Sequence, residues 1–196
     1  DESASIFGRS LHVQVHRGQS FVTPVMPVTR KHLSDKALTP QVRGELKSPI
    51  AVIQEYVEKE TMEEYRRCNG TLNKIYEDVA TYSMSSSDMY NVATLQIEPM
   101  GIKDPESLST IMKQLDIPSL SAVCMPPMKG DLEQYERALR SWIDKADQCG
   151  KDCVPQVRMD EEPETFAERI MLLKEYAKTG SVRMIDFRYA PREKNQ

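Results

Sequence analysis

The sequence lacks the short motifs that hold nucleotides or build the most familiar catalytic centres. It contains no G-x-x-x-x-G-K-[ST] loop and no G-x-G-x-x-G turn, which argues against a nucleotide bound in a glycine-rich cradle. It also contains no G-x-S-x-G elbow and no H-E-x-x-H helix. Any active site in this chain must therefore be sought in the arrangement of its strands and not in a local signature.

Extremes of charge and hydrophobicity are also absent. With 39% hydrophobic residues, 29% charged residues and a net charge of −4, the composition is that of a folded domain. This charge balance gives no indication of nucleic-acid binding, which would need a basic stripe. No apolar run approaches the ~20 residues needed to cross a bilayer, and the first ten residues lack the order of a signal peptide. We therefore expect a soluble protein without a membrane partner.

Cysteine and histidine are too few and too scattered to predict a metal cluster. The four cysteines show no C-x-x-C pair, and no histidine follows position 32. His12 and His16 share a strand face but have no third ligand nearby, so we interpret them as surface or packing residues. Cys149 and Cys153 are interpreted as ordinary thiols, which indicates a cytoplasmic or other reducing intracellular compartment.

The 196 residues are predicted to form a single domain with three sections. The first section, 1–47, begins with a β-hairpin whose strands, 10–16 and 19–28, meet at Arg17-Gly18, and it continues as an irregular segment. The second, 48–82, is predicted to be a helical hairpin. Its helices span 49–68, where Ser48 is the N-cap and Pro49 the first helical residue, and 71–82. Repeated βα units fill the third section, 89–196.

The third section alternates strands and helices at a regular spacing. Strands are predicted at 91–98, 120–126, 153–160 and 182–189, and the helices between them begin after Asp104, near Asp131 and near Pro163. Gly150 and Gly180 are expected to end the last two helices. Strand and helix alternating in this way are typical of βαβ units with a parallel sheet.

The strands alternate between apolar and polar residues, which favours helices on only one face of the sheet. Strands covered on both faces would be apolar almost throughout. Because βαβ crossovers are right-handed, helices on one side require the sheet to wind in one direction and curl. We therefore predict a barrel-like or partial (β/α) barrel, with a doubly wound open sheet as the alternative. The strands are too few for eight βα units, which leaves a partial barrel, a barrel completed by another chain, or a fragment of a longer one.

The polar strand face is predicted to carry the candidate site near the carboxyl ends of the strands, where α/β active sites lie. Its carboxylates could act as a general base or bind a divalent metal such as Mg²⁺, and its arginines could bind a phosphate or carboxylate. No other cofactor is indicated. The alternative is an ion network in which these charges neutralise one another. The candidates are catalytic Glu98, Asp160 and Asp186, and ligand-binding Gln96, Gln156, Arg158 and Arg188.

Next to this site, the acidic tract Asp160-Glu161-Glu162 is interpreted as a helix start, where negative charge is favourable. Trp142, with Leu139 and Ala146 on one helical face, is interpreted as core.

A segment near the N-terminus resembles the tRNA-guanine transglycosylase family. Residues 23–28 read T-P-V-M-P-V and residues 36–40 read K-A-L-T-P, similar to the family's T-P-x-F-M-P-V strand and the K-x-L-T-P-like stretch that follows it. The resemblance, over residues 17–40, implies an α/β barrel preceded by a hairpin. The family's D-S-G-G-F-Q segment with its catalytic aspartate and its C-x-C-x-x-C zinc cluster are absent, so no catalytic residue is carried over.

Two classes of function agree with these patterns. The first is an enzyme or ligand-binding domain whose charged site acts on a small anionic or phosphorylated substrate. That hypothesis predicts a concave site with at least one acid that lacks an arginine partner. The second is a non-catalytic subunit of a larger assembly, in which the polar sheet face or the long helix 49–68 contacts a protein partner or a second copy of the chain. It predicts an incomplete barrel with an exposed sheet edge and a defined oligomer. A divergent tRNA-guanine transglycosylase-like protein is a further alternative.

Overall fold

The computed structural model describes most of the chain from residue 73 onward and shorter segments before it. The described residues are 12–14, 20–22, 27–29, 49–57, 73–97, 100–101, 111, 115–126 and 128–188.

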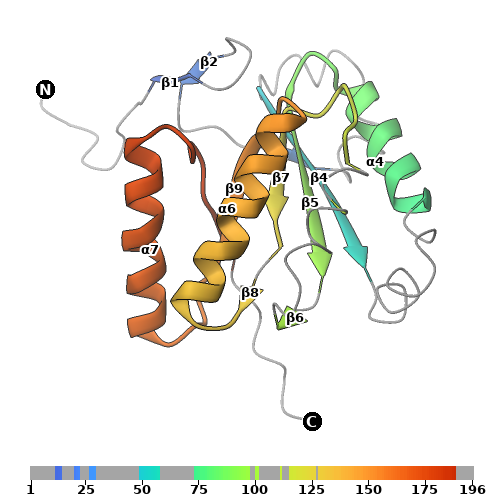
Figure 1. Cartoon of the computed structure of the whole chain (residues 1–196). Coiled ribbons are helices and arrows are strands. Elements are labelled where there is room, and N and C mark those ends of the chain that lie inside the picture. Colours follow the sequence, from blue (N-terminus) through green and yellow to red (C-terminus); the bar gives the residue numbers. More distant parts are fainter. Residues whose placement is uncertain are drawn as a thin grey trace, which may run out of the picture.

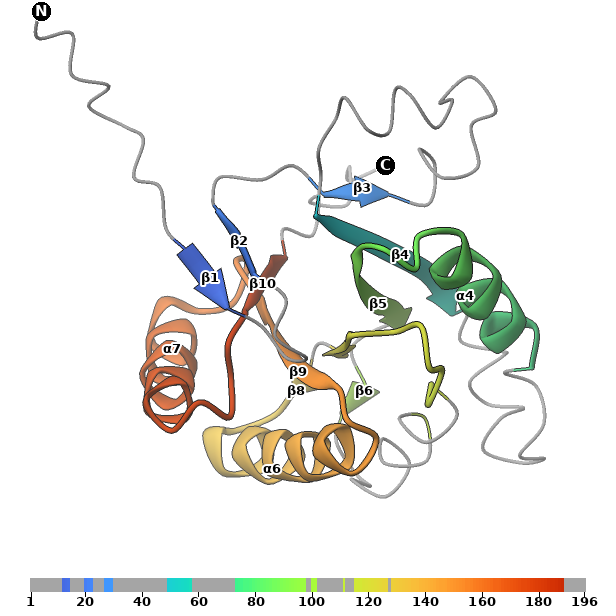
Figure 2. The same ribbon diagram turned by 90° about the horizontal axis from the view of Figure 1, so that it is seen from above.

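In the described part of the chain, six parallel strands form the main sheet, and they follow one another in space in the same order as in the chain. Strands β4, β5, β7 and β9 can be followed in Figure 1, and β3 and β10 in Figure 2. An uninterrupted order means that the sheet winds in one direction, so the chain is a partial α/β barrel, as predicted. A doubly wound sheet would reverse its strand order at a switch point, and this sheet does not. The strands are β3 (Val28–Thr29), β4 (Ile50–Val57), β5 (Tyr90–Ile97), β7 (Ala122–Met125), β9 (Asp152–Arg158) and β10 (Asp186–Arg188).

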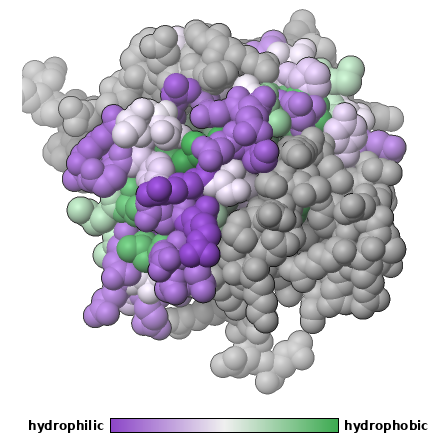
Figure 3. All heavy atoms as spheres, in the orientation of Figure 1, coloured by the Kyte–Doolittle hydropathy of each residue, from purple (hydrophilic) through white to green (hydrophobic). Residues whose placement is uncertain are grey.

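The helices of the described residues lie on the convex side of this curled sheet (Figure 2): α4 (Asn73–Ser85), α6 (Leu132–Gln148) and α7 (Pro163–Lys178). The Asp131 side chain caps α6 by accepting a hydrogen bond of 2.8 Å from the Gln134 amide. Gly150 and Gly180, with φ of 63° and 78°, follow the last two helices, as the sequence predicts. The surface over α6 and α7 is mainly hydrophilic, with smaller hydrophobic areas (Figure 3), which agrees with helices that bury one side only.

The sheet separates two groups of buried side chains. The larger group lies between the sheet and the helices and includes Trp142, whose indole donates a hydrogen bond of 3.4 Å to the Val123 carbonyl. The prediction that Trp142 is a core residue is confirmed. The smaller group lies on the opposite face, called the inner face below, and consists of Tyr90, Val92, Ala122, Cys124 and Val154.

The predicted helix over 49–68 is wrong, because residues 50–57 form strand β4. All eight of its residues are in register with β5, so this strand is an integral part of the sheet. The β-branched residues Ile50, Val52 and Ile53 favour a strand, and Ala51 and Ile53 are fully buried in it. The apolar residues in this stretch fit the periodicity of a helix as well as that of a strand. Pairing with β5 in the sheet selects the strand. Residues 58–68 lie outside the described part of the chain.

Other predicted elements are confirmed with different bounds. The N-terminal hairpin pairs β1 (His12–Gln14) with β2 (Ser20–Val22) in antiparallel fashion. The predicted second hairpin strand, 19–28, is nevertheless wrong at its end, because Val28 belongs to β3 in the main sheet. The turn at Arg17-Gly18 lies outside the described residues, as does nearly all of the predicted helix after Asp104.

The last predicted strand, 182–189, is reduced to β10, residues 186–188. The backbone at Val182 instead donates to the Tyr176 carbonyl near the end of α7, and the Val182 side chain is buried. A separate short ladder connects β6 (Met100–Gly101), just after β5, to β8 (Met128–Lys129), just after β7.

Candidate functional site

Gln156, Asp186 and Arg188 lie together on the inner face, near the carboxyl ends of two neighbouring strands. Strands β9 and β10 are in register at Asp186 and Gln156 and at Arg188 and Arg158. The Gln156 amide donates a hydrogen bond of 2.8 Å to Asp186 Oδ2, and its carbonyl oxygen accepts one of 3.3 Å from Arg188 Nη1. A single neutral side chain therefore holds both the carboxylate and the guanidinium.

The charges of this group are not fully neutralised by one another. Gln156 is only 1% exposed, whereas Asp186 and Arg188 are half-buried. Among the described residues, Asp186 forms no ion pair, and its hydrogen bond comes from a neutral amide. The ligand-site hypothesis requires an acid without an arginine partner, as Asp186 is among the described residues. In an ion network whose charges neutralise one another, every acid would have such a partner.

Thr94 and Cys124 border this group, although they are not among the candidates from the sequence. The Thr94 hydroxyl donates to the Cys124 sulfur over 3.1 Å. Burial raises the pKa of the Cys124 thiol to about 12, while the hydrogen bond from Thr94 lowers it in part. The thiol is therefore protonated near neutral pH and is a packing group, not a nucleophile. The alternation of strand faces could have placed both residues on the inner face.

Arg158 and Asp160 form their own pair at the end of β9. The guanidinium makes two hydrogen bonds to the carboxylate, of which the Nε–Oδ1 bond measures 2.9 Å. This hydrogen bonding to Arg158 holds the pKa of Asp160 below its usual value. The structure thus does not bring Asp160 together with Asp186, and the assignment of Asp160 as a catalytic acid or base stays a prediction.

Two of the sequence candidates cannot be placed. Glu98 and the side chain of Gln96 lie outside the described part of the structure, as do the side chains of His12 and His16. Within the described ranges, no three His, Cys, Asp or Glu side chains are grouped so that they could hold a metal ion. A Mg²⁺ site that includes Glu98 therefore stays a prediction.

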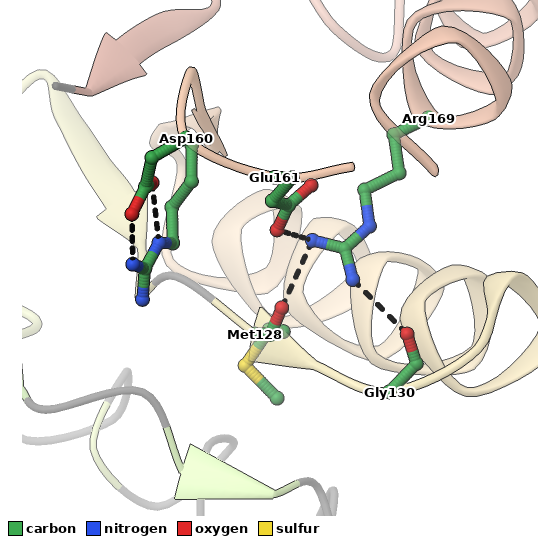
Figure 4. Close-up of polar contacts among 6 residues, drawn as sticks. Met128, Gly130, Asp160, Glu161 and Arg169 are labelled. Atoms are coloured by element: carbon green, nitrogen blue, oxygen red, sulfur yellow. Dashed lines mark hydrogen bonds and ion pairs between the residues drawn. The ribbon is translucent and has the colours of Figure 1, made fainter. Parts of the chain in front are cut away.

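A second charged cluster, between α7 and the strand ends, was missed by the sequence reasoning. Arg169 of α7 pairs with Glu161 and donates to the carbonyl oxygens of Met128 and Gly130 over 2.9 and 3.1 Å (Figure 4). The tract Asp160-Glu161-Glu162 does precede α7, as interpreted, and Glu161 has this ion pair in addition. The pairing could not be seen in the sequence, because Glu161 and Arg169 stand eight residues apart and meet only through the turn into α7.

A third polar group lies at the opposite, amino-terminal ends of the strands. The Tyr90 hydroxyl donates to Asp152 Oδ2 over 2.5 Å, and Arg183 donates to Asp152 Oδ1 over 2.7 Å. Burial, followed by the bond to Asp152, raises the pKa of Tyr90. Both oxygens of this carboxylate are hydrogen-bonded, and this end of a barrel sheet commonly serves stability. We interpret the group as structural.

The described helices include none long and apolar enough to cross a lipid bilayer. No family model matches the chain, and no curated protein matches it. A solved structure that is similar is the HpcH/HpaI aldolase from Desulfitobacterium hafniense DCB-2, with 12% sequence identity and a TM-score of 0.36. The match covers 74% of this chain and 59% of that chain, so the chain spans about 59% of that protein's length.

Nothing about substrate or mechanism follows from a likeness at this level. No comparison bears on the tRNA-guanine transglycosylase family, and residues 17–40 lie mostly outside the described residues, so that resemblance stays a prediction.

Proposed function

We propose that this chain is an enzyme or ligand-binding domain that takes a small anionic or phosphorylated ligand at the carboxyl ends of β9 and β10. The observation that carries the proposal is the hydrogen-bonded group of Asp186, Gln156 and Arg188. Among the described residues, Arg188 contacts an amide oxygen at 3.3 Å and forms no ion pair, so its half-buried guanidinium retains donors for an anion. In this proposal Arg188 binds the ligand's phosphate or carboxylate.

Asp186 has the complementary role in the proposed site. Its carboxylate is held by a neutral amide, so it can accept a hydrogen bond or a proton from a hydroxyl or amino group of the ligand. Gln156 is almost fully buried and contacts both charged groups, so it fixes their spacing. The expected ligand therefore combines an anionic group with a neighbouring hydrogen-bond donor.

The direct test is a titration of the whole chain with inorganic phosphate. Binding is measured by calorimetry and by NMR of the arginine side chains. We expect saturable binding that is reduced about tenfold or more in Arg188→Gln, because a charge-assisted hydrogen bond to an anion is lost. The control is Arg137→Gln, since Arg137 forms an exposed ion pair with Glu133 on α6, away from the strand ends. Absence of saturable binding, or equal binding by Arg188→Gln, would refute the proposal.

A second candidate function is that of a non-catalytic subunit in an assembly. It is favoured by two apolar side chains beside the β10 edge, Met159 and Phe187, which are 58% and 51% exposed. Analytical ultracentrifugation at increasing protein concentration distinguishes the two functions. If the second function is correct, copies of the chain associate with one another, and Phe187→Ser weakens this self-association. A chain that stays monomeric and binds phosphate supports the first function.

A further inference from the structure

Arg169 connects the two loops that follow β7 and β9. It is 2% exposed and donates from one guanidinium to three acceptors: the Met128 and Gly130 carbonyls after β7, and Glu161 after β9 (Figure 4). Both loops lie at the carboxyl ends of the strands, the end that carries Gln156, Asp186 and Arg188. A helix side chain on the outside of the sheet therefore reaches the edge at which the site is built.

The connection extends beyond these two loops. Met128 belongs to β8, which pairs with β6 in the loop after β5, so three consecutive strand-to-helix connections are linked. On the other side, the chain around Glu161 is tied to β10, because the Met159 amide donates to the Arg188 carbonyl over 2.8 Å. Two residues of backbone separate that hydrogen bond from Glu161. A displacement of Glu161 would therefore be transmitted to Arg188.

The buried pair is not arranged for maximal stability. Within the described part of the chain, Arg169 Nε, Glu161 Oε2 and the hydroxyl of the nearby Tyr135 have no hydrogen-bond partner. The guanidinium also lies over the Tyr135 ring, 4.5 Å from its centre. Burying charges with incomplete hydrogen bonding is costly, and apolar replacement of both members of such a pair is often tolerated. The specific contribution of this pair is thus the geometry that it imposes on the two loops.

We infer that Arg169 is a positioning residue for the ligand site. Through Glu161 and the carbonyls of Met128 and Gly130, it sets the spacing of the loops after β7 and β9 and thereby the position of Arg188. This inference rests on the proposed function for its effect on binding. Its effect on the loops is independent of any ligand. A positioning error on the order of 1 Å lowers the efficiency of a site strongly, even when the altered residue does not touch the ligand.

The test uses Arg169→Lys in the full chain, because lysine keeps the charge but cannot reproduce the fork of three hydrogen bonds. We expect amide hydrogen exchange to accelerate about tenfold or more at 128–130 and 159–162, with the amides of β5 and β7 unchanged. Phosphate affinity should fall about tenfold. The control is Arg140→Lys. Arg140 of α6 donates to Glu136 of the same helix and to Tyr176 of α7, so it also connects two elements, but on the exposed surface.

A double variant, Arg169→Met with Glu161→Leu, separates positioning from stability. It removes both charges, so we expect it to fold even if Arg169→Lys does not. The inference predicts faster exchange in both loops and weaker phosphate binding at unchanged global stability. Hydrogen exchange in both loops at the wild-type rate would overturn the inference. Phosphate affinity equal to that of the wild type, in a double variant whose loops exchange faster, would overturn it as well.

If the wild-type chain binds no phosphate, the proposed function fails. Hydrogen exchange in the two loops then decides by itself whether Arg169 sets their arrangement.

Discussion

The Gln156 amide lies between a carboxylate and a guanidinium, and it donates to Asp186 across the β9–β10 ladder at 2.8 Å. Asp186 and Gln156 are directly opposite each other in register, so their side chains leave the sheet on the same face. Arg188 stands two residues further along β10, which places it on that face as well. The grouping on one face therefore follows from strand period and register.

Replacing Asp186 by asparagine should strengthen the binding of sulfate. The substitution keeps a side chain of the same size, which can still bond Gln156, but it removes a negative charge near Arg188. Sulfate carries no proton at neutral pH, so it repels the carboxylate and gains nothing from it. We expect roughly threefold to tenfold tighter binding at low salt, and a smaller gain at high salt, as measured by calorimetry. Weaker binding in this variant would contradict the arrangement.

Glu161 should make the stability of the fold depend on pH in a defined direction. Burial raises its pKa in the folded chain above 4.5, although Arg169 offsets part of the effect. Between 4.5 and the raised pKa, the unfolded chain loses its proton first, so wild-type stability falls as pH rises. In Glu161→Gln this loss is absent, so the stability of the variant relative to wild type should increase from pH 4.5 upward.

Urea unfolding at a series of pH values measures this difference. Replacing a protonated carboxyl by an amide adds a constant offset, because the attraction between Arg169 and the ionised carboxylate is already contained in the folded-state pKa of Glu161. The matched control is Glu164→Gln, in the exposed first turn of α7. A difference between wild type and Glu161→Gln that does not change with pH would show that Glu161 is not held in a desolvated position.

Gly130→Ala should destabilise the chain more than Gly150→Ala. Gly130 has a φ of 134°, and an added Cβ would lie 2.4 Å from Gln134 Oε1. Gly150 has a φ of 63°, with nothing within 4 Å of an added Cβ. Both changes force a side chain into an unfavourable backbone conformation, which costs about 1–2 kcal/mol. The strain is greater at Gly130, because a φ of 134° lies outside the left-handed region that other residues visit, and the flexible end of Gln134 must also move.

Thermal or urea unfolding should therefore rank the two variants. We expect the free energy of unfolding of Gly130→Ala to be about 1 kcal/mol lower than that of Gly150→Ala. Because the Gly130 carbonyl accepts from Arg169, this variant should also speed hydrogen exchange at 159–162. Equal stability of the two variants would show that the backbone at Gly130 relaxes away from its φ of 134° without cost.

The inner face of β9 and β10 could be predicted from sequence, whereas the partners of its residues could not. Alternation in 153–160 and 182–189 placed Gln156, Asp186 and Arg188 on one face. It placed Arg158 and Asp160 there as well, but these two pair with each other, because Asp160 lies in the turn after β9 and no longer follows the period of the strand. Neighbours in a turn are set by backbone geometry, which residue spacing alone does not define.

The failure at residues 50–57 has a different cause. Isoleucine, valine and tyrosine at these positions fit one face of a helix or the pleat of a strand, and local propensity is weak enough for the tertiary context to choose. The place next to β5 accepts a strand of eight residues, with Ala51 and Ile53 buried.

The sequence by itself determined the parallel βα order, the single winding direction of the sheet and the inward direction of its polar residues. These features follow from hydrophobic period, helix caps and the right-handed crossover, all of which act over short stretches of chain. Only the tertiary structure decided that Gln156 hydrogen-bonds both Asp186 and Arg188, that Cys124 is buried next to them, and that Arg169 forms an ion pair with Glu161. Those contacts depend on strand register and on helix position to within about 1 Å, which is set by packing between distant segments.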